Sequence, residues 1–177
     1  MILHTDRLIL RPFADADRDA YAAMMADPEV GYWLGATLSR AEADAQVDRF
    51  MAASDAPEPG FLALEARANG AFLGAACLRR VQAGHPMAGY TEMGWRLARA
   101  AWGTGFATEA ARALMDFGFG TYDLKQIVAF TAVTNNRSRA VMERLGLSRR
   151  HALDFDHPAL PADHPLRAHL VYAVVRP

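Results

Sequence analysis

The chain has 177 residues, of which 52% are hydrophobic and 22% charged, and its formal net charge at pH 7 is −1. This composition predicts one domain over residues 1–177 with a sizeable core, and it argues against a disordered chain and against a dedicated nucleic-acid binder, which carries a basic excess. With Cys77 as its lone cysteine, no apolar run near the roughly 20 residues that span a bilayer, and no signal-peptide pattern, we expect a cytoplasmic protein that binds no membrane.

The first third of the chain is predicted to hold one strand and two helices. The branched run at 8–13 is stopped by a proline, which is typical of a strand. Asp15 or Asp17 after this strand can cap a helix, which Asp27-Pro28 ends. The second helix begins at Ser39, because Glu42 three residues later completes the spacing of a capping box. We expect this helix to end at the turn-rich segment 55–60.

The middle of the chain is predicted to form a hairpin, a strand and a helix. Two strand-like runs, 61–66 and 72–78, flank Asn69-Gly70, a pair that favours a tight reversal. A further strand at 90–97 leads into a loop with two glycines at 102–105. Apolar residues recur at helical spacing after this loop, so the loop opens a helix.

The last third is predicted to hold two strands around a short helix. The β-branched run at 127–133 favours a central strand. A helix over 138–145 ends at Gly146, which suits a C-cap, and a strand at 170–175 follows. The resulting order of strand, two helices, three strands, helix, strand, helix and strand is that of a single-sheet α/β or α+β domain.

The loop at 102–105 is the most informative segment. The first N–H groups of a helix have no partner within it, and the helix dipole adds about half a positive charge there. Glycines such as Gly103 and Gly105 let the main chain approach closely, so amides alone can hold a pyrophosphate. A P-loop is excluded because no Lys-Ser/Thr follows Gly105, and a dinucleotide fingerprint lacks its third glycine. A tight strand-to-helix turn without a ligand remains the alternative.

Several segments together carry a family signature. The run at 102–110 is similar to an acetyl-CoA loop, and Asn135-Asn136-Arg137-Ser138, followed by 143–147, is similar to that family's Asn-x-x-Ser and its following helix. The opening at 5–12, followed by 27–30, is similar to an N-terminal signature of one branch. On these residues the chain resembles the GCN5-related N-acetyltransferase (GNAT) superfamily, and within it the RimJ/RimL-like branch, over nearly its whole length.

The resemblance implies a fold and a co-substrate site. The fold is α/β (α+β), a single mixed, curved sheet with splayed central strands and flanking helices. The pantetheine arm of acetyl-CoA would lie between the strands at 90–97 and 127–133. The residues that the resemblance assigns to acetyl-CoA are Leu97, through its main chain, and Trp102, Gly103, Thr104, Gly105, Ala107, Thr108, Asn135 and Ser138.

The resemblance also implies catalytic residues. Glu92 would be the general base, acting through a water, or else an exposed strand carboxylate or a partner of Arg96. The position seven after Asn135, often a tyrosine proton donor in this superfamily, is Met142, whose thioether cannot donate a proton. Ser138 is therefore expected to protonate the departing thiolate, or else only to contact the cofactor or cap a helix. Asn135 would bind pantetheine amides or stabilise a turn.

The implied reaction is acetyl transfer from acetyl-CoA to a primary amine, by direct attack in a ternary complex. The amine would be a protein N-terminal α-amine or a small amine, and the protein a monomer or homodimer. Alternatives are a non-catalytic acyl-CoA-binding protein and a transferase for a longer acyl-CoA. No metal is expected, because the six histidines show no ligand spacing. A late group of polar residues either shapes the acceptor pocket or belongs to a surface loop; its members are His151, Asp154, Asp156 and His157.

Overall fold

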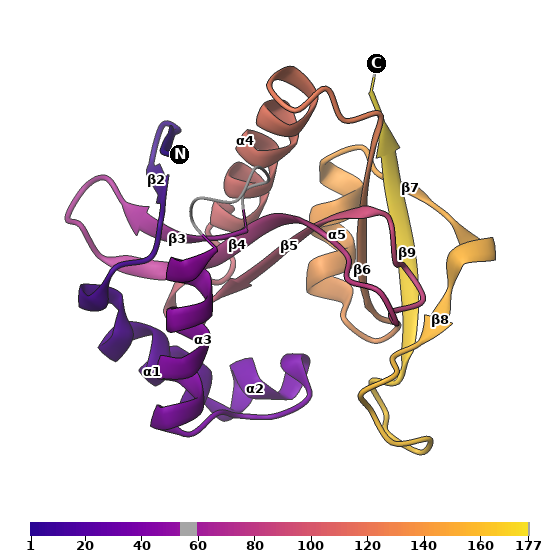
Figure 1. Cartoon of the computed structure of the whole chain (residues 1–177), viewed down its shortest axis with the longest axis horizontal. Coiled ribbons are helices and arrows are strands. Elements are labelled where there is room, and N and C mark those ends of the chain that lie inside the picture. The colour runs from indigo at the N-terminus through magenta and orange to yellow at the C-terminus, as the bar shows by residue number, and fades with distance from the viewer. Residues whose placement is uncertain (54–59, 177) are drawn as a thin grey trace.

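The computed structural model describes residues 1–53 and 60–176 as one open sheet with helices on both faces (Figure 1). Residues 55–59 of the predicted turn lie outside the described residues. The strands are β1 (Leu3–His4), β2 (Leu8–Arg11), β3 (Phe61–Ala66), β4 (Phe72–Arg80), β5 (Thr91–Leu97), β6 (Gln126–Ala132), β7 (Ser148–Arg149), β8 (Phe155–Asp156) and β9 (Ala168–Val175). The helices are α1 (Arg18–Ala26), α2 (Pro28–Leu34), α3 (Arg40–Ala52), α4 (Phe106–Gly120) and α5 (Asn136–Arg144), with 3-10 turns η1 (Asp15–Asp17), η2 (Arg99–Ala101) and η3 (His151–Leu153).

The sheet opens between its two central strands. Among the described residues its order is β1-β2-β3-β4-β5-β6-β9-β7, with β8 on β9, and every pair is antiparallel except β5–β6. β5 pairs with β4 along its whole length, but with β6 only where Glu92 faces Val128. Beyond this contact the two strands separate. The predicted fold class, a single mixed sheet with splayed central strands, is confirmed.

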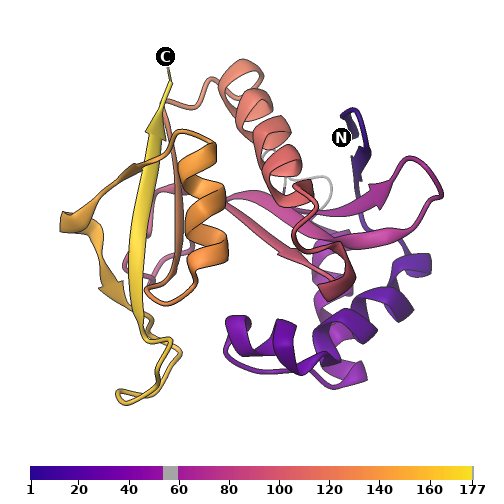
Figure 2. The ribbon, with the colours of Figure 1, turned by 180° about the vertical axis from the view of Figure 1, so that it is seen from behind.

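The helices cover different parts of the two faces of the sheet. α4 and α5 lie on one face, whereas α1 and α3 lie on the other (Figure 2). The core beneath α4 and α5 includes Met93, Leu114, Ile127 and Met142. The core beneath α1 and α3 includes Tyr21, Val47, Ala63 and Ala75, and a smaller core on β6 and β9 includes Val81, Met87, Val128 and Val171. Because side chains alternate along β6, Val128 lies on the face opposite Ile127.

None of the described helices combines the length and apolar composition that a membrane crossing requires.

Helix α2 was not predicted, because Asp27-Pro28 was taken only as the end of a helix. Asp27 in fact caps α2, with its Oδ1 accepting the N–H of Glu29 at 2.9 Å, and Pro28 is the first helical residue. Proline suits this position, since the first N–H of a helix has no intrahelical partner. α2 ends at Gly35, whose φ of 90° places it in the left-handed region.

Candidate functional site

The main chain of β5 faces the opening between the splayed strands. Ala98 donates its N–H to the carbonyl of Leu73 at 2.9 Å, which makes these two residues a hydrogen-bonded antiparallel pair. Such pairs alternate along a ladder, so Trp95 and Leu97 direct their N–H and C=O groups away from β4, toward β6. The Leu97 carbonyl accepts the indole N–H of Trp102 at 2.8 Å. An amide-bearing ligand in the opening can therefore bind β5 as an added strand would.

A cradle of main-chain N–H groups lies just beyond β5, in the loop that opens α4. Gly103 and Gly105 have φ values of 75° and 85°, and α4 begins with no side-chain cap. The first helical bond runs from the Glu109 N–H to the Gly105 carbonyl at 3.0 Å. In the described chain, the N–H groups of residues 103–108 have no acceptor. Unpaired N–H groups at the start of a fifteen-residue helix favour an anion.

The predicted loop residues contribute to this cradle in different ways. The Thr104 hydroxyl donates to the Ala101 carbonyl at 2.8 Å, so Thr104 offers its N–H to a ligand, not its hydroxyl proton. Ala107 and Thr108 occupy the first turn of α4. The guanidinium of Arg137 lies 4.5 Å above the ring of Trp102, so the start of α5 adjoins the cradle.

Arg7 braces the cradle and was not predicted to do so. Its Nε donates to Glu109 Oε2 at 2.7 Å, its Nη1 donates to the Thr104 carbonyl at 3.0 Å, and its guanidinium lies 4.5 Å above Phe106. Thr5 also donates to Glu109, at 2.6 Å. Burial opposes the charge of Glu109, yet the hydrogen bonds from Thr5 and Arg7 lower its pKa. The carboxylate beside the cradle is thus neutralised by a residue about a hundred positions away. The only signal for Arg7 in the sequence is that it belongs to the opening signature at 5–12.

Glu92 lies at the point where the strands separate. It is 7% exposed, and its Oε1 accepts the Nε–H of Arg79 from β4 at 2.6 Å. Its Oε2 is buried without a partner in the described chain. Burial raises the pKa of Glu92, and the charge of Arg79 partly offsets this. Glu92 is therefore not an exposed carboxylate, and its ion-pair partner is Arg79, since Arg96 donates to the hydroxyl of Tyr21 at 3.1 Å.

Asn135 and Ser138 meet at the start of α5. Asn135 is the N-cap, and its Oδ1 accepts the Ser138 N–H at 3.2 Å. The alternative in which Ser138 caps this helix is therefore wrong. The Ser138 hydroxyl has no hydrogen bond in the described chain. Met142 is buried in the core and turned away from any proton transfer.

A cluster of five rings lies on the sheet face opposite α4 and α5; we call it the ring cluster. It consists of His85, Phe130, Phe155, His157 and His169. Neighbouring ring centroids are 5.0 to 5.4 Å apart for the His85–Phe130, Phe155–His169 and His157–His169 pairs. The sequence did not reveal this cluster, because its members are spread over 85 positions and come together only when β9 folds beside β6.

The late polar residues predicted either to shape the acceptor pocket or to lie in a surface loop do not stay together in the structure. His157 belongs to the ring cluster, whereas His151 is exposed on η3. Asp154 binds Arg149 at 2.5 Å, and Asp156 binds Arg167 at 3.2 Å. These two carboxylates are therefore structural. Among the residues with described coordinates, no group of three His, Cys, Asp or Glu side chains is placed to hold a metal ion.

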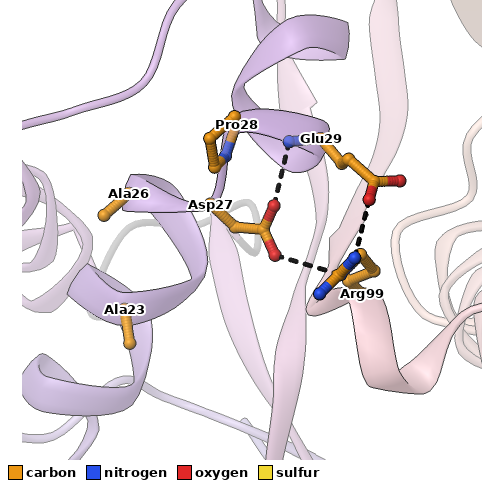
Figure 3. Close-up of a pocket in the computed structure, with 6 residues that line it drawn as sticks. All are labelled: Ala23, Ala26, Asp27, Pro28, Glu29 and Arg99. Carbon is orange, nitrogen blue, oxygen red and sulfur yellow. Dashed lines mark hydrogen bonds and ion pairs between the residues drawn. The ribbon is translucent and has the colours of Figure 1, made fainter.

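A shallow pocket lies beside α1 and α2 (Figure 3). Arg99 Nη1 donates to Glu29 Oε1 at 2.6 Å, and its Nε lies 3.4 Å from Asp27 Oδ2. The ion pairs join α2 to the turn after β5. The charged side chains of this pocket therefore pair with one another and hold these two segments together. Its six lining residues are Ala23, Ala26, Asp27, Pro28, Glu29 and Arg99.

Comparisons with known proteins agree on one family. The family model described as the acetyltransferase (GNAT) domain matches residues 7–148. An Aspergillus fumigatus protein named FsC-acetyl coenzyme A-N(2)-transacetylase is 31% identical over 151 residues, covering 82% of this chain and only 64% of the relative. A GNAT-family acetyltransferase from Bacillus anthracis has a TM-score of 0.82 at 22% identity, over 99% of this chain and 98% of that one. A Vibrio cholerae protein described as a candidate ribosomal-protein-serine acetyltransferase has a TM-score of 0.78 at 18% identity, over the same shares. Both structural likenesses concern the fold.

Proposed function

Because the chain belongs to the acetyltransferase (GNAT) domain family and is an acetyl-transfer enzyme, we propose that it acetylates a primary amine by direct attack on acetyl-CoA in a ternary complex. The observation that carries this proposal is the row of unpartnered N–H groups at 103–108, next to a strand whose main chain faces an opening. We further propose a cytoplasmic protein of one domain over residues 1–177, of the RimJ/RimL-like branch, acting as a monomer or homodimer. The signature at 5–12 supports the branch, since Thr5 and Arg7 within it brace the cradle.

The cradle suits the diphosphate of coenzyme A. The N–H groups of Gly103, Gly105 and Ala107 can donate to phosphate oxygens without a lysine. Trp102 fixes the Leu97 carbonyl, which leaves the Leu97 N–H as the main-chain donor for the pantetheine arm. The remaining assigned contacts lie around this path; they come from Thr104, Thr108, Asn135 and Ser138.

Glu92 is the proposed general base. The reaction needs an uncharged amine, so the ammonium must first lose a proton. The buried Oε2 of Glu92 can take that proton through a water, and the raised pKa brings the carboxylate closer to the basicity the task needs. The amine nitrogen then bonds to the thioester carbon, and the C–S bond of the tetrahedral intermediate breaks. The nitrogen releases its second proton, which balances the proton that the thiolate of coenzyme A takes up.

Ser138 is the proposed donor of that last proton. Its hydroxyl lies at the start of α5 without a protein partner. A thiol with a pKa of about 8.5 leaves readily, so little assistance is needed. An acyl-enzyme on Cys77 is disfavoured, because burial raises the pKa of that thiol to about 12.

The Gly103→Ala variant tests the cradle. An added Cβ at Gly103 meets no protein atom within 4 Å and would occupy the space of the anion. We expect acetyl-CoA affinity, measured by calorimetry, to fall at least about tenfold, or about 1.4 kcal/mol. Gly70→Ala is the matched control, because its φ of 71° and its open surroundings give the same backbone strain far from the cradle. Equal affinity in both variants would remove the cradle from the proposal.

A further inference from the structure

The ring cluster lies where an acceptor amine would approach Glu92. Glu92 faces Val128, and Phe130 is the next residue on the same face of β6, in the part that has separated from β5. His85 stacks on Phe130, and it lies near enough to Arg79 for that charge to lower its pKa. All five rings are only half-buried, so they present a surface at this face of the opening.

The pKa of each imidazole in the cluster lies below its ordinary value, which favours the uncharged ring. Burial lowers the pKa of His85, His157 and His169; the charge of Arg79 lowers that of His85 further, whereas the hydrogen bond to the Arg167 carbonyl partly offsets burial for His169. The charged groups around them are engaged elsewhere. Arg79 binds Glu92, Asp154 binds Arg149 and Asp156 binds Arg167, whereas Asp163 is exposed to solvent.

The hydrogen-bond roles of the three imidazoles follow from their neighbours. His85 Nδ1 accepts the Met87 N–H at 3.1 Å, and His157 Nδ1 accepts the Ala159 N–H at 3.3 Å, so each neutral ring carries its proton on Nε2. His169 Nδ1 faces the Arg167 carbonyl at 3.1 Å, so this nitrogen is the donor and Nε2 an acceptor. The cluster thus offers ring atoms and neutral polar atoms, and none of its five members carries a carboxylate that could pair with a second ammonium group.

The loop after β8 borders the ring cluster, because it begins at His157. A Cβ at Gly35 would lie 3.1 Å from Leu160 Cδ2, so the Leu160 side chain of this loop packs against the end of α2. Arg167 holds the loop, because its Nη1 donates to the Leu160 carbonyl at 2.6 Å and its carbonyl accepts the His157 N–H at 2.8 Å. The loop that follows His157 of the ring cluster is therefore held in place at both points.

We propose that the ring cluster binds the non-reacting part of the acceptor, and that the acceptor is a small primary amine carrying an uncharged aromatic ring. This inference rests on the proposed acetyl transfer and names its substrate class. Edge-to-face and offset contacts with Phe130 and Phe155 would hold the ring. The ammonium would then lie toward Glu92, which accepts its proton.

The test is a comparison of kcat/KM between amines, measured as release of free coenzyme A at saturating acetyl-CoA. The probes are 2-phenylethylamine, its saturated analogue 2-cyclohexylethylamine, the polycation spermidine and a short peptide with a free N-terminal alanine. We expect 2-phenylethylamine to be preferred over its saturated analogue by about 3- to 10-fold, the range of a ring–ring contact. Spermidine and the peptide should be poorer substrates still.

Two variants test whether the preference for 2-phenylethylamine arises at the ring cluster. Phe155→Leu keeps an apolar side chain but removes one ring, so KM for 2-phenylethylamine should rise toward that of the saturated analogue with kcat unchanged. Phe117→Leu is the matched control, since Phe117 is a half-buried phenylalanine of α4 that contacts Tyr122 outside the cluster. Equal use of both ring amines by the unaltered enzyme, or a preference for spermidine or the peptide, overturns this inference and leaves acetyl transfer standing. Failure to acetylate any amine while acetyl-CoA binds overturns the proposed function and the inference together.

Discussion

Glu92 is buried, with one carboxylate oxygen bound to Arg79 and the other without a partner among the residues that the structure describes. A purely structural ion pair would satisfy both oxygens, because an unsatisfied buried acceptor is costly. The arrangement therefore fits a group that binds a water or substrate proton in the working enzyme. Its position on the strand beside the opening supports the same role.

Glu92→Gln should reduce kcat strongly while acetyl-CoA affinity changes little. Burial raises the pKa of Glu92, so activity of the unaltered enzyme should fall as the pH drops through a value above the ordinary glutamate range. The variant should lose this limb of its kcat–pH profile. Glu65→Gln is the control, because it removes a carboxylate partner of Arg11 on β3, away from the opening. An unchanged profile in Glu92→Gln would exclude Glu92 as the base.

Substitutions at Asn135 and Ser138 should have different effects, the first on the stability of the fold and the second on catalysis. Asn135→Ala removes the cap of α5 and should lower the free energy of unfolding by about 1 kcal/mol, as measured in urea. Ser138→Ala leaves the capped N–H in place, so its stability should be unchanged. Because the thiolate is a fair leaving group, kcat of Ser138→Ala should fall only modestly, by about tenfold or less. A loss as large as that of Glu92→Gln would mean that Ser138 does more than protonate the thiolate.

The opening signature braces the cradle through Thr5 and Arg7, which lie between β1 and β2. Arg7→Ala should weaken acetyl-CoA binding, because the Thr104 carbonyl and Glu109 lose their shared partner. Arg67→Ala is the matched control: Arg67 carries the same charge and its Nη1 donates to the carbonyls of Thr5 and Asp6, but within the described residues it makes no hydrogen bond to the loop at 102–105. Calorimetry with acetyl-CoA on both variants decides the matter, and equal affinities would exclude a bracing role.

Among the elements, the sequence predicts those with strong local patterns. The capping box of Ser39 and Glu42 gave the start of α3, and Asn69-Gly70 gave the β3–β4 hairpin. The two-residue strands β1, β7 and β8 were not predicted, because such short segments exist only through pairing with longer neighbours. The same limit applies to the site. The glycine loop is local in sequence, whereas the ring cluster and the Arg7 brace depend on which strands become neighbours.

In the whole molecule, the two halves of the sheet meet through a single main-chain pairing. β1–β5 lie on one side and β6, β9, β7 and β8 on the other, joined where Glu92 faces Val128. The proposed acetyl-CoA contacts are divided in the same way. The cradle belongs to α4, and Asn135 and Ser138 belong to the start of α5. A ligand that bridges both halves should therefore tighten the opening itself.

Amide hydrogen exchange measures this tightening. Binding stabilises the folded state by about 2.7 kcal/mol when the ligand is at 100 times its Kd. With coenzyme A, we expect slower exchange at 95–97 and 103–108, and little change in β1 to β3. Pantetheine, which lacks the diphosphate, should protect 95–97 but not 103–108. Because the two ligands differ in the phosphate-bearing part, protection of 103–108 by pantetheine would show that the cradle responds to closure of the strands and not to an anion.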